Sequence, residues 1–281
     1  MAQEDLKQIT DRAKAGSAEA QLELGIRYYN GTGVTQDFAL AASWMAKAAK
    51  QGNADAQKNL GLCYEYGKGV PQDYAKAVAW YTKAADQGHA GAQSNLGFCY
   101  FYGKGVAQDQ KKAAELYAKA AAQGHAGAQS NLGFCYYNGQ GVEKDFKKTA
   151  EFYSKAAAQG HAVAQFNLGL CYFNGEGVSQ NYAQAAEWFR KASDQGSAIA
   201  QYFLGYCYYN GQGVKQDYKK AADLMALSAG AGNVSAQSFL GFCYYNGQGV
   251  KQDVGKAKFW FKTAADAGDE SAKQILEQLN G

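Results

Sequence analysis

Apolar and polar positions along the chain repeat with a period of 36 residues. Within residues 53–88, apolar residues at helical spacing predict a first helix from Ala54 to Tyr66 and a second from Asp73 to Gly88. The segment LGLCYEYGKGVPQD, which begins at Leu60, is one of seven similar copies with no insertion between them. A strict period of this length indicates a solenoid, in which no unit buries its apolar face alone and neighbouring units must stack.

The two helices of a repeat are joined by a turn that contains two glycines. Gly67 and Gly69 lie two residues apart, and both can adopt positive φ, so we predict a tight helix–helix turn with Val70 directed into the core. A phosphate-binding loop is disfavoured because the motif follows a helix rather than a strand and recurs in every repeat. Asp73 is expected to cap the second helix, and Gly88 to end it in a left-handed conformation.

Small and apolar residues of the first helix fall on one arc, which we predict to be its core side. Gly61 lies at the margin of this arc, where a missing side chain would let the second helix approach closely. All four tryptophans occupy one position of the second helix, and we expect their rings to pack against the alanines and glycine of the first helix. They are Trp44, Trp80, Trp188 and Trp260.

The period also sets the expected domain organisation. The prediction is an all-α fold, a right-handed α/α solenoid or superhelix, with capping helices at residues 1–16 and 269–281. Glu277 and Gln278 are polar replacements that suit a terminal unit. The seven two-helix repeats between the caps are expected at 17–52, 53–88, 89–124, 125–160, 161–196, 197–232 and 233–268.

Charge and hydropathy exclude some classes of partner. The net charge of +3 is too small to indicate nucleic acid or an anionic membrane as the main partner. No apolar run approaches the roughly 20 residues of a membrane span. The opening MAQEDLKQITDR has neither the basic nor the apolar region of a secretory signal, so we expect a cytoplasmic protein.

Six cysteines recur once per repeat, each at the same place. Equivalent helices of stacked repeats should lie about 8–10 Å apart, whereas a disulfide needs Cα atoms within about 7 Å. We therefore expect free, buried thiols that act as small apolar side chains, in a reducing compartment. The same distances make a zinc site improbable. The residues are Cys63, Cys99, Cys135, Cys171, Cys207 and Cys243.

The pattern AxAQxxLGxxYxxGxGVxxDxxxAxxWxxxAAxxG resembles the Sel1-like repeat, a 36-residue relative of the tetratricopeptide repeat. The resemblance covers essentially the whole chain, with small departures at Arg27, Thr149 and Asn181. It implies that the first helices line a concave surface that contacts partner proteins. The cysteine-rich Helicobacter branch of the family carries two cysteines per repeat, and this chain has one. It also lacks a Ser-x-x-Lys motif, so the weak penicillin-binding activity of that branch is not carried over.

The side of the first helix opposite the core arc carries large side chains and asparagines. One interpretation is an aromatic groove that binds an extended segment or a helix of another protein. The other is that equivalent rings stack on each other and only stabilise the array. Both stay open. The expected partner-binding residues are Phe98, Phe101, Phe134, Tyr137, Phe166, Leu170, Phe173, Tyr202, Tyr206, Tyr209, Phe242 and Tyr245, beside Asn59, Asn95, Asn131 and Asn167.

No catalytic, cofactor or metal site is predicted. His89, His125 and His161 are interpreted as loop residues, and Lys111 and Lys112 as solvated outer surface. The expected function is a non-enzymatic, monomeric scaffold or adaptor that binds a protein or peptide on the concave face. A bacterial immunity or host-interaction protein using the same face is an alternative. A β-lactamase-like hydrolase is the alternative of another class, disfavoured because no nucleophile, base and acid interrupt the periodicity.

Overall fold

The computed structural model describes residues 6–280, which form sixteen α-helices and no β-strand. Residues 1–5 of the predicted N-terminal cap, and Gly281, lie outside the described residues. The all-α prediction is confirmed, and consecutive helices pack in pairs with an additional helix at each end. The helices fall into two compact units, divided between Lys144 and Asp145, and each unit is described by itself.

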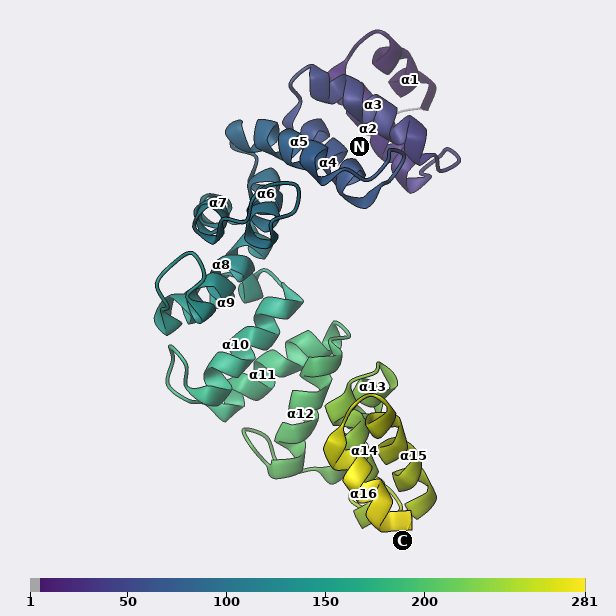
Figure 1. Cartoon of the computed structure of the whole chain (residues 1–281), viewed down its shortest axis with the longest axis vertical. Coiled ribbons are helices and arrows are strands. Elements are labelled where there is room, and N and C mark those ends of the chain that lie inside the picture. The colour runs from purple at the N-terminus through teal and green to yellow at the C-terminus, as the bar shows by residue number, and fades with distance from the viewer. Residues whose placement is uncertain (1–5, 281) are drawn as a thin grey trace. The chain divides into compact units, whose positions relative to one another are not determined.

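Unit 1 contains the first eight helices, which pack against their neighbours in chain order (Figure 1). A first helix and the following second helix make the most extensive contacts, and each second helix then packs on the next first helix. The helices are α1 (Leu6–Lys14), α2 (Ala18–Asn30), α3 (Phe38–Lys50), α4 (Ala54–Tyr66), α5 (Tyr74–Asp86), α6 (Ala90–Tyr102), α7 (Gln110–Ala122) and α8 (Ala126–Asn138).

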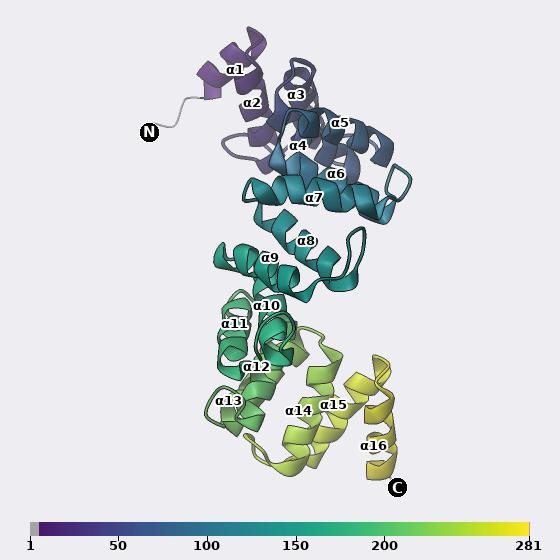
Figure 2. The same cartoon turned by 90° about the vertical axis from the view of Figure 1, so that its left-hand side faces the viewer.

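Unit 2 repeats this arrangement with the remaining eight helices (Figure 2). It begins with a second helix, α9, and ends with α16, which packs on α15 as a further first helix would. The helices are α9 (Phe146–Ala158), α10 (Ala162–Asn174), α11 (Tyr182–Asp194), α12 (Ala198–Asn210), α13 (Tyr218–Gly230), α14 (Val234–Asn246), α15 (Val254–Asp266) and α16 (Glu270–Asn280).

The helix ends have the expected caps. The Asp73 side chain accepts a hydrogen bond from the backbone N–H of Lys76 at 2.9 Å, and thereby satisfies a donor that the helix leaves free. Gly67 and Gly69 have φ of +64° and +73°, and Gly88 has φ of +85°. These glycines therefore take the left-handed conformations that the sequence predicted for the turn and for the end of the second helix.

The close approach predicted at Gly61 is confirmed, but the ring that fills it is not a tryptophan. A Cβ atom at Gly61 would lie 2.5 Å from Cε1 of Tyr81. Trp80 is half-buried against the core that contains Ala56 and Leu60 of α4, and Lys83 Nζ lies 4.3 Å from the centre of its ring. The prediction for the tryptophans therefore holds for the alanines of the first helix but not for its glycine, because one residue along a helix turns the side chain by about 100° and only Tyr81 is directed at Gly61.

The second glycine of each turn also forms the junction with the preceding repeat. A Cβ atom at Gly105 would overlap the backbone carbonyl group of Tyr74, the first residue of α5. Gly33 differs, because an added Cβ there would meet only Nη1 of Arg27, at 3.9 Å. The turn therefore needs glycine both for its φ and for backbone contact between repeats. The same overlap occurs at Gly69, Gly141, Gly177, Gly213 and Gly249.

A glutamine near the start of the first helix links three helices. Gln57 Nε2 donates to the carbonyl oxygen of Ala49 at 3.1 Å, and Gln57 Oε1 accepts from Gln87 Nε2 at 2.7 Å. In the last two repeats Ala231 and Ala267 stand where the first five have the second glutamine, and Oε1 of Gln237 is buried without a described partner. The paired form also occurs at Gln21–Gln51, Gln93–Gln123 and Gln165–Gln195.

The six cysteines are free and buried, which confirms the prediction for their packing. Burial raises the pKa of the Cys63 thiol to about 11 and that of Cys99 to about 12, because an ionised sulfur would lose its hydration. These thiols are therefore neutral side chains of the core at physiological pH.

Candidate functional site: the first-helix face

The first-helix face is the side of α2, α4, α6, α8, α10, α12 and α14 that points away from the core arc, and it carries the twelve predicted contact residues. The structure places them at different depths. Phe101 and Phe166 are buried, whereas Phe134, Phe242 and Tyr245 are about 40% exposed. The others are half-buried: Phe98, Tyr137, Leu170, Phe173, Tyr202, Tyr206 and Tyr209.

In unit 2 the rings of this face pack on one another. The ring of Phe203 lies between neighbours, with centroid distances of 5.3 Å to Phe189 and 5.5 Å to Phe166. Tyr209 meets Phe239 at 4.8 Å in an edge-to-face arrangement. Such pairs are favourable at 4.5–7 Å, so these rings stabilise one another. The pairs join different positions of the repeat, whereas the stacking interpretation expected equivalent rings to meet.

In unit 1 the corresponding positions of the first-helix face are polar. Phe203 and Phe239 are replaced there by Asn59, Asn95 and Asn131. Of the predicted rings in this unit, Phe101 and Phe134 contact each other with centroids 6.1 Å apart. The face of unit 1 is therefore lined by amide groups with fewer ring-to-ring contacts than unit 2 has.

A groove of about 520 Å³ opens on this face between α2 and α4. Its walls are mainly apolar, and Lys58 and Asn59 bring an ammonium and an amide into it. Lys58 Nζ donates to Asn59 Oδ1 at 2.7 Å. The lining residues are Leu22, Ile26, Tyr29, Asn30, Met45, Asp55, Lys58, Asn59 and Leu62.

A smaller pocket of about 160 Å³ lies further along the same face and contains a buried carboxylate. Glu65 stands where other repeats have a ring, and its Oε2 accepts a hydrogen bond from the Tyr81 hydroxyl at 2.6 Å. Burial, and then the bond to Glu65, raise the pKa of Tyr81, so this phenol stays protonated and donates. Tyr66, Ser94, Asn95, Phe98 and Asn131 complete the pocket.

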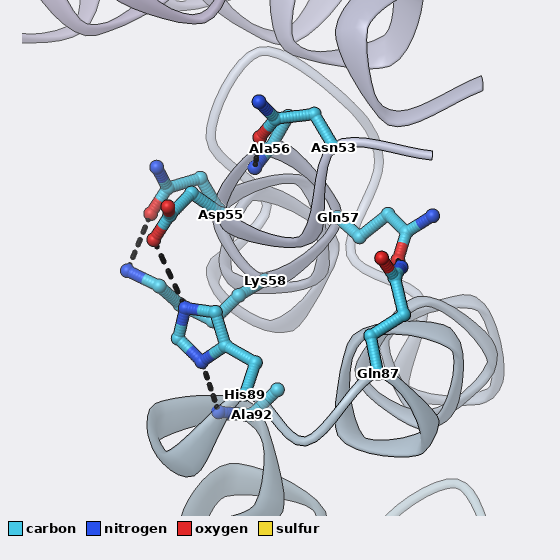
Figure 3. Close-up of polar contacts among 9 residues, drawn as sticks. Asn53, Asp55, Ala56, Gln57, Lys58, Gln87, His89 and Ala92 are labelled. Atoms are coloured by element: carbon cyan, nitrogen blue, oxygen red, sulfur yellow. Dashed lines mark hydrogen bonds and ion pairs between the residues drawn. The ribbon is translucent and has the colours of Figure 1, made fainter. Parts of the chain in front are cut away.

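The histidines have a structural role that the sequence analysis missed. His89 Nδ1 accepts from the backbone N–H of Ala92 at 3.1 Å, so His89 caps α6, and its Nε2 lies 2.9 Å from Asp55 Oδ1 (Figure 3). His125 and His161 cap α8 and α10 in the same way. Their sequence position matches that of Ser17, Asn53, Ser197 and Asn233, which are common capping residues, and this alignment was the available signal.

Metal-binding and membrane-spanning features were also sought within residues 6–280. The described part of the chain holds no cluster of three or more His, Cys, Asp or Glu side chains suited to a metal ion. None of the described helices has the length and hydropathy needed to cross a membrane. Lys111 and Lys112 are exposed, as predicted, and Lys112 Nζ donates to the Tyr100 hydroxyl at 2.7 Å.

Comparison with known proteins identifies relatives with the same repeat. A crystal structure of a protective antigen from uropathogenic Escherichia coli, described as displaying an SLR fold, is 40% identical, with a TM-score of 0.89 over 99% of this chain and 59% of the antigen. A Sel1 repeat protein from Oxalobacter formigenes is 38% identical, with a TM-score of 0.76 over 97% of this chain and 79% of that protein.

A shorter match links the chain to the secretory immunoglobulin A-binding protein EsiB of Escherichia coli O6:H1. The two are 43% identical over 44 residues, which are 16% of this chain and 9% of EsiB. The chain thus spans less than two thirds of both Escherichia coli proteins.

The family model named Sel1 repeat matches seven consecutive segments, each beginning one residue after the boundary that we predicted from the sequence. They are 18–53, 54–89, 90–125, 126–161, 162–197, 198–233 and 234–269. These segments account for most of the chain and contain the helix pairs, glycine turns and caps described above. The chain belongs to the Sel1 repeat family.

Proposed function

We propose that this chain is a non-enzymatic scaffold or adaptor that binds a partner protein or peptide on its first-helix face. The observation that carries the proposal is the groove between α2 and α4, which combines apolar walls with polar atoms on a face that is filled by rings in unit 2. Membership of a family of stacked repeats supports it, because such repeats lengthen a surface more readily than they assemble one catalytic centre.

The proposed contact residues are the twelve predicted from sequence, and their exposure sets how each could act. Phe134, Phe242 and Tyr245 offer ring surface to a partner, since about 40% of each residue is accessible. Phe101 and Phe166 are buried, so they would act by supporting their neighbours. Free, buried thiols support a reducing compartment such as the cytoplasm, and the proposal is for a monomer.

A second candidate within the same class is a host-interaction protein. Its support is the similarity to an immunoglobulin A-binding protein and to a protective antigen of Escherichia coli. The partner of this chain would then be an extracellular host protein rather than a bacterial one. Capture experiments with each kind of partner separate the two candidates.

The test compares substitutions on the first-helix face with a matched substitution elsewhere. Phe134→Ser and Phe242→Ser remove exposed rings from that face, and Leu227→Ser removes an exposed apolar side chain from the second helix α13. A captured partner should be lost with the face variants and kept with the control, while circular dichroism stays unchanged. Retention by all three variants would contradict the proposal, and turnover of a chromogenic β-lactam by the purified protein would favour a hydrolase.

A further inference from the structure

Lys58 is an exception at its position in the repeat. The equivalent residues of the six other first helices are uncharged: Leu22, Ser94, Ser130, Phe166, Tyr202 and Ser238. A lysine here lies within the groove between α2 and α4 rather than on the solvated outer side of the repeat. Periodicity does not require this charge, and packing in the other repeats proceeds without it.

The ammonium of Lys58 is partly withdrawn from water. Burial lowers the pKa of this lysine, and the carboxylate of Asp55 partly opposes that effect. The hydrogen-bond partner of Nζ is neutral, namely Asn59 Oδ1 at 2.7 Å. Asp55 Oδ1 is directed at His89 Nε2, 2.9 Å away (Figure 3). The ammonium of Lys58 therefore donates to a neutral amide oxygen, and the groove leaves space beside it for a charged acceptor.

The surroundings of Lys58 suit a single carboxylate with an apolar neighbour. Ile26 and Leu62 form apolar walls of the groove, and Asn59, whose oxygen is occupied by Lys58, keeps its amide N–H groups for an incoming acceptor. Charge-assisted hydrogen bonds from an ammonium to a carboxylate are stronger than those to neutral acceptors. Asp55 lines the same groove, and its negative charge repels a doubly charged phosphate more than a singly charged carboxylate.

We propose that this groove binds an aspartate or glutamate side chain in an extended segment of the partner, with its carboxylate on Lys58 Nζ and the Asn59 amide. An apolar side chain next to that acid would lie between Ile26 and Leu62. The inference rests on the proposed function, because it specifies the chemistry of the segment that the first-helix face takes.

The test is selection of displayed peptides on the full chain, with both peptide termini blocked. Sequences with Asp or Glu beside Leu, Ile or Phe should be enriched. A synthetic peptide of the enriched sequence should bind about tenfold to a hundredfold less tightly to Lys58→Ser in fluorescence anisotropy. Serine is tolerated at this position, because Ser94, Ser130 and Ser238 occupy it in other repeats. Lys111→Ser removes an exposed lysine from the second helix α7, and should leave the affinity unchanged.

A double-mutant cycle makes the assignment specific. Replacing the acid of the peptide by its amide should weaken binding to the native chain as much as Lys58→Ser does, and should have little further effect on Lys58→Ser itself. Independent, additive losses would overturn the contact, as would enrichment that requires a free C-terminal carboxylate.

The outcomes also separate this inference from the proposed function. Enriched peptides without an acid, lost with Ile26→Ser but insensitive to Lys58→Ser, would refute the carboxylate site while supporting the first-helix face. Absence of any enriched peptide would count against both.

Discussion

Units 1 and 2 share one repeat but differ on the first-helix face. At the position of Asn95 in unit 1, unit 2 keeps Asn167 in its first copy and then has Phe203 and Phe239, whose rings pack on other rings. Unit 1 alone has a carboxylate at one copy of a ring position, namely the buried Glu65 that accepts from Tyr81, where Phe173 of unit 2 lies 6.2 Å from Phe189. The comparison shows that the repeat keeps its core and its junctions constant, while its first-helix face can be polar or covered by packed aromatic rings.

The largest expected effect concerns what the two units share. Gly105→Ala in unit 1 and Gly213→Ala in unit 2 should each lower the free energy of unfolding by about 4 kcal/mol or more, because the new Cβ overlaps the backbone of the preceding repeat. Gly33→Ala is the matched control: it has the same positive φ but no backbone neighbour, so about 1–2 kcal/mol is expected. Urea unfolding measures all three, and equal losses would show that φ alone matters.

The next prediction exchanges residues between the units. Phe203→Asn in unit 2 should lower the free energy of unfolding by about 2–4 kcal/mol, since it removes a ring that contacts Phe166, Phe173 and Phe189. Asn95→Ala, at the equivalent position in unit 1, should change it by less than about 0.5 kcal/mol. Chemical denaturation of both variants is the measurement. Similar losses would mean that the polar row of unit 1 is as structural as the rings of unit 2.

The third prediction concerns replacement of Tyr81 and Glu65 in unit 1 by phenylalanine, the residue at the equivalent positions 189 and 173 of unit 2. Tyr81→Phe should lower the free energy of unfolding by about 1–3 kcal/mol, because Glu65 would lose its hydroxyl donor while buried. Adding Glu65→Phe should restore most of this loss, since it reproduces the Phe173–Phe189 pair. Thermal unfolding of the single and double variants gives the coupling. An unchanged stability in Tyr81→Phe would contradict the role assigned to this bond.

The smallest effect per residue is expected at high pH. The pKa of Cys99 in unit 1 and of Cys207 in unit 2 is raised to about 12, above the value of about 8.5 for an unfolded chain. Their contribution is therefore fully present below about pH 8.5 and is lost as the pH rises towards 12, by about 1 kcal/mol per thiol at pH 9.5. Urea unfolding at pH 7.5 and 9.5 under reducing conditions measures the fall. Cys99→Ala and Cys207→Ala should each make the pH-dependent fall in the free energy of unfolding smaller by the same amount. Unequal changes would show that the two cores differ.

The sequence predicted the parts of the fold that depend on local chemistry. Helix ends follow from residues such as Asp73 and Gly67, whose capping and left-handed conformations need no tertiary information. It did not select between the adjacent rings of Trp80 and Tyr81, because only the packed geometry decides which of them faces Gly61.

The candidate site was harder to predict for the same reason. Phe101 and Tyr245 occupy the same position of the repeat, yet the first is buried and the second is about 40% exposed, so the period does not separate them. The groove around Lys58 was not predictable as a cavity, because its walls come from both α2 and α4 and only the packed geometry brings them together. Gln57 and Gln87 each recur along the chain, but the sequence does not indicate that their side chains hydrogen-bond to each other.

The turn-glycine junction has a consequence for how such a chain can change its length. Each contact, such as that of Gly105 with the start of α5, is specified by two neighbouring copies and refers to nothing beyond them. An inserted or deleted segment of 36 residues would thus bring matching connections on both sides, without compensating substitutions elsewhere. Duplication can then extend the available surface by whole repeats, while single substitutions such as the one at Lys58 adapt one repeat to a ligand.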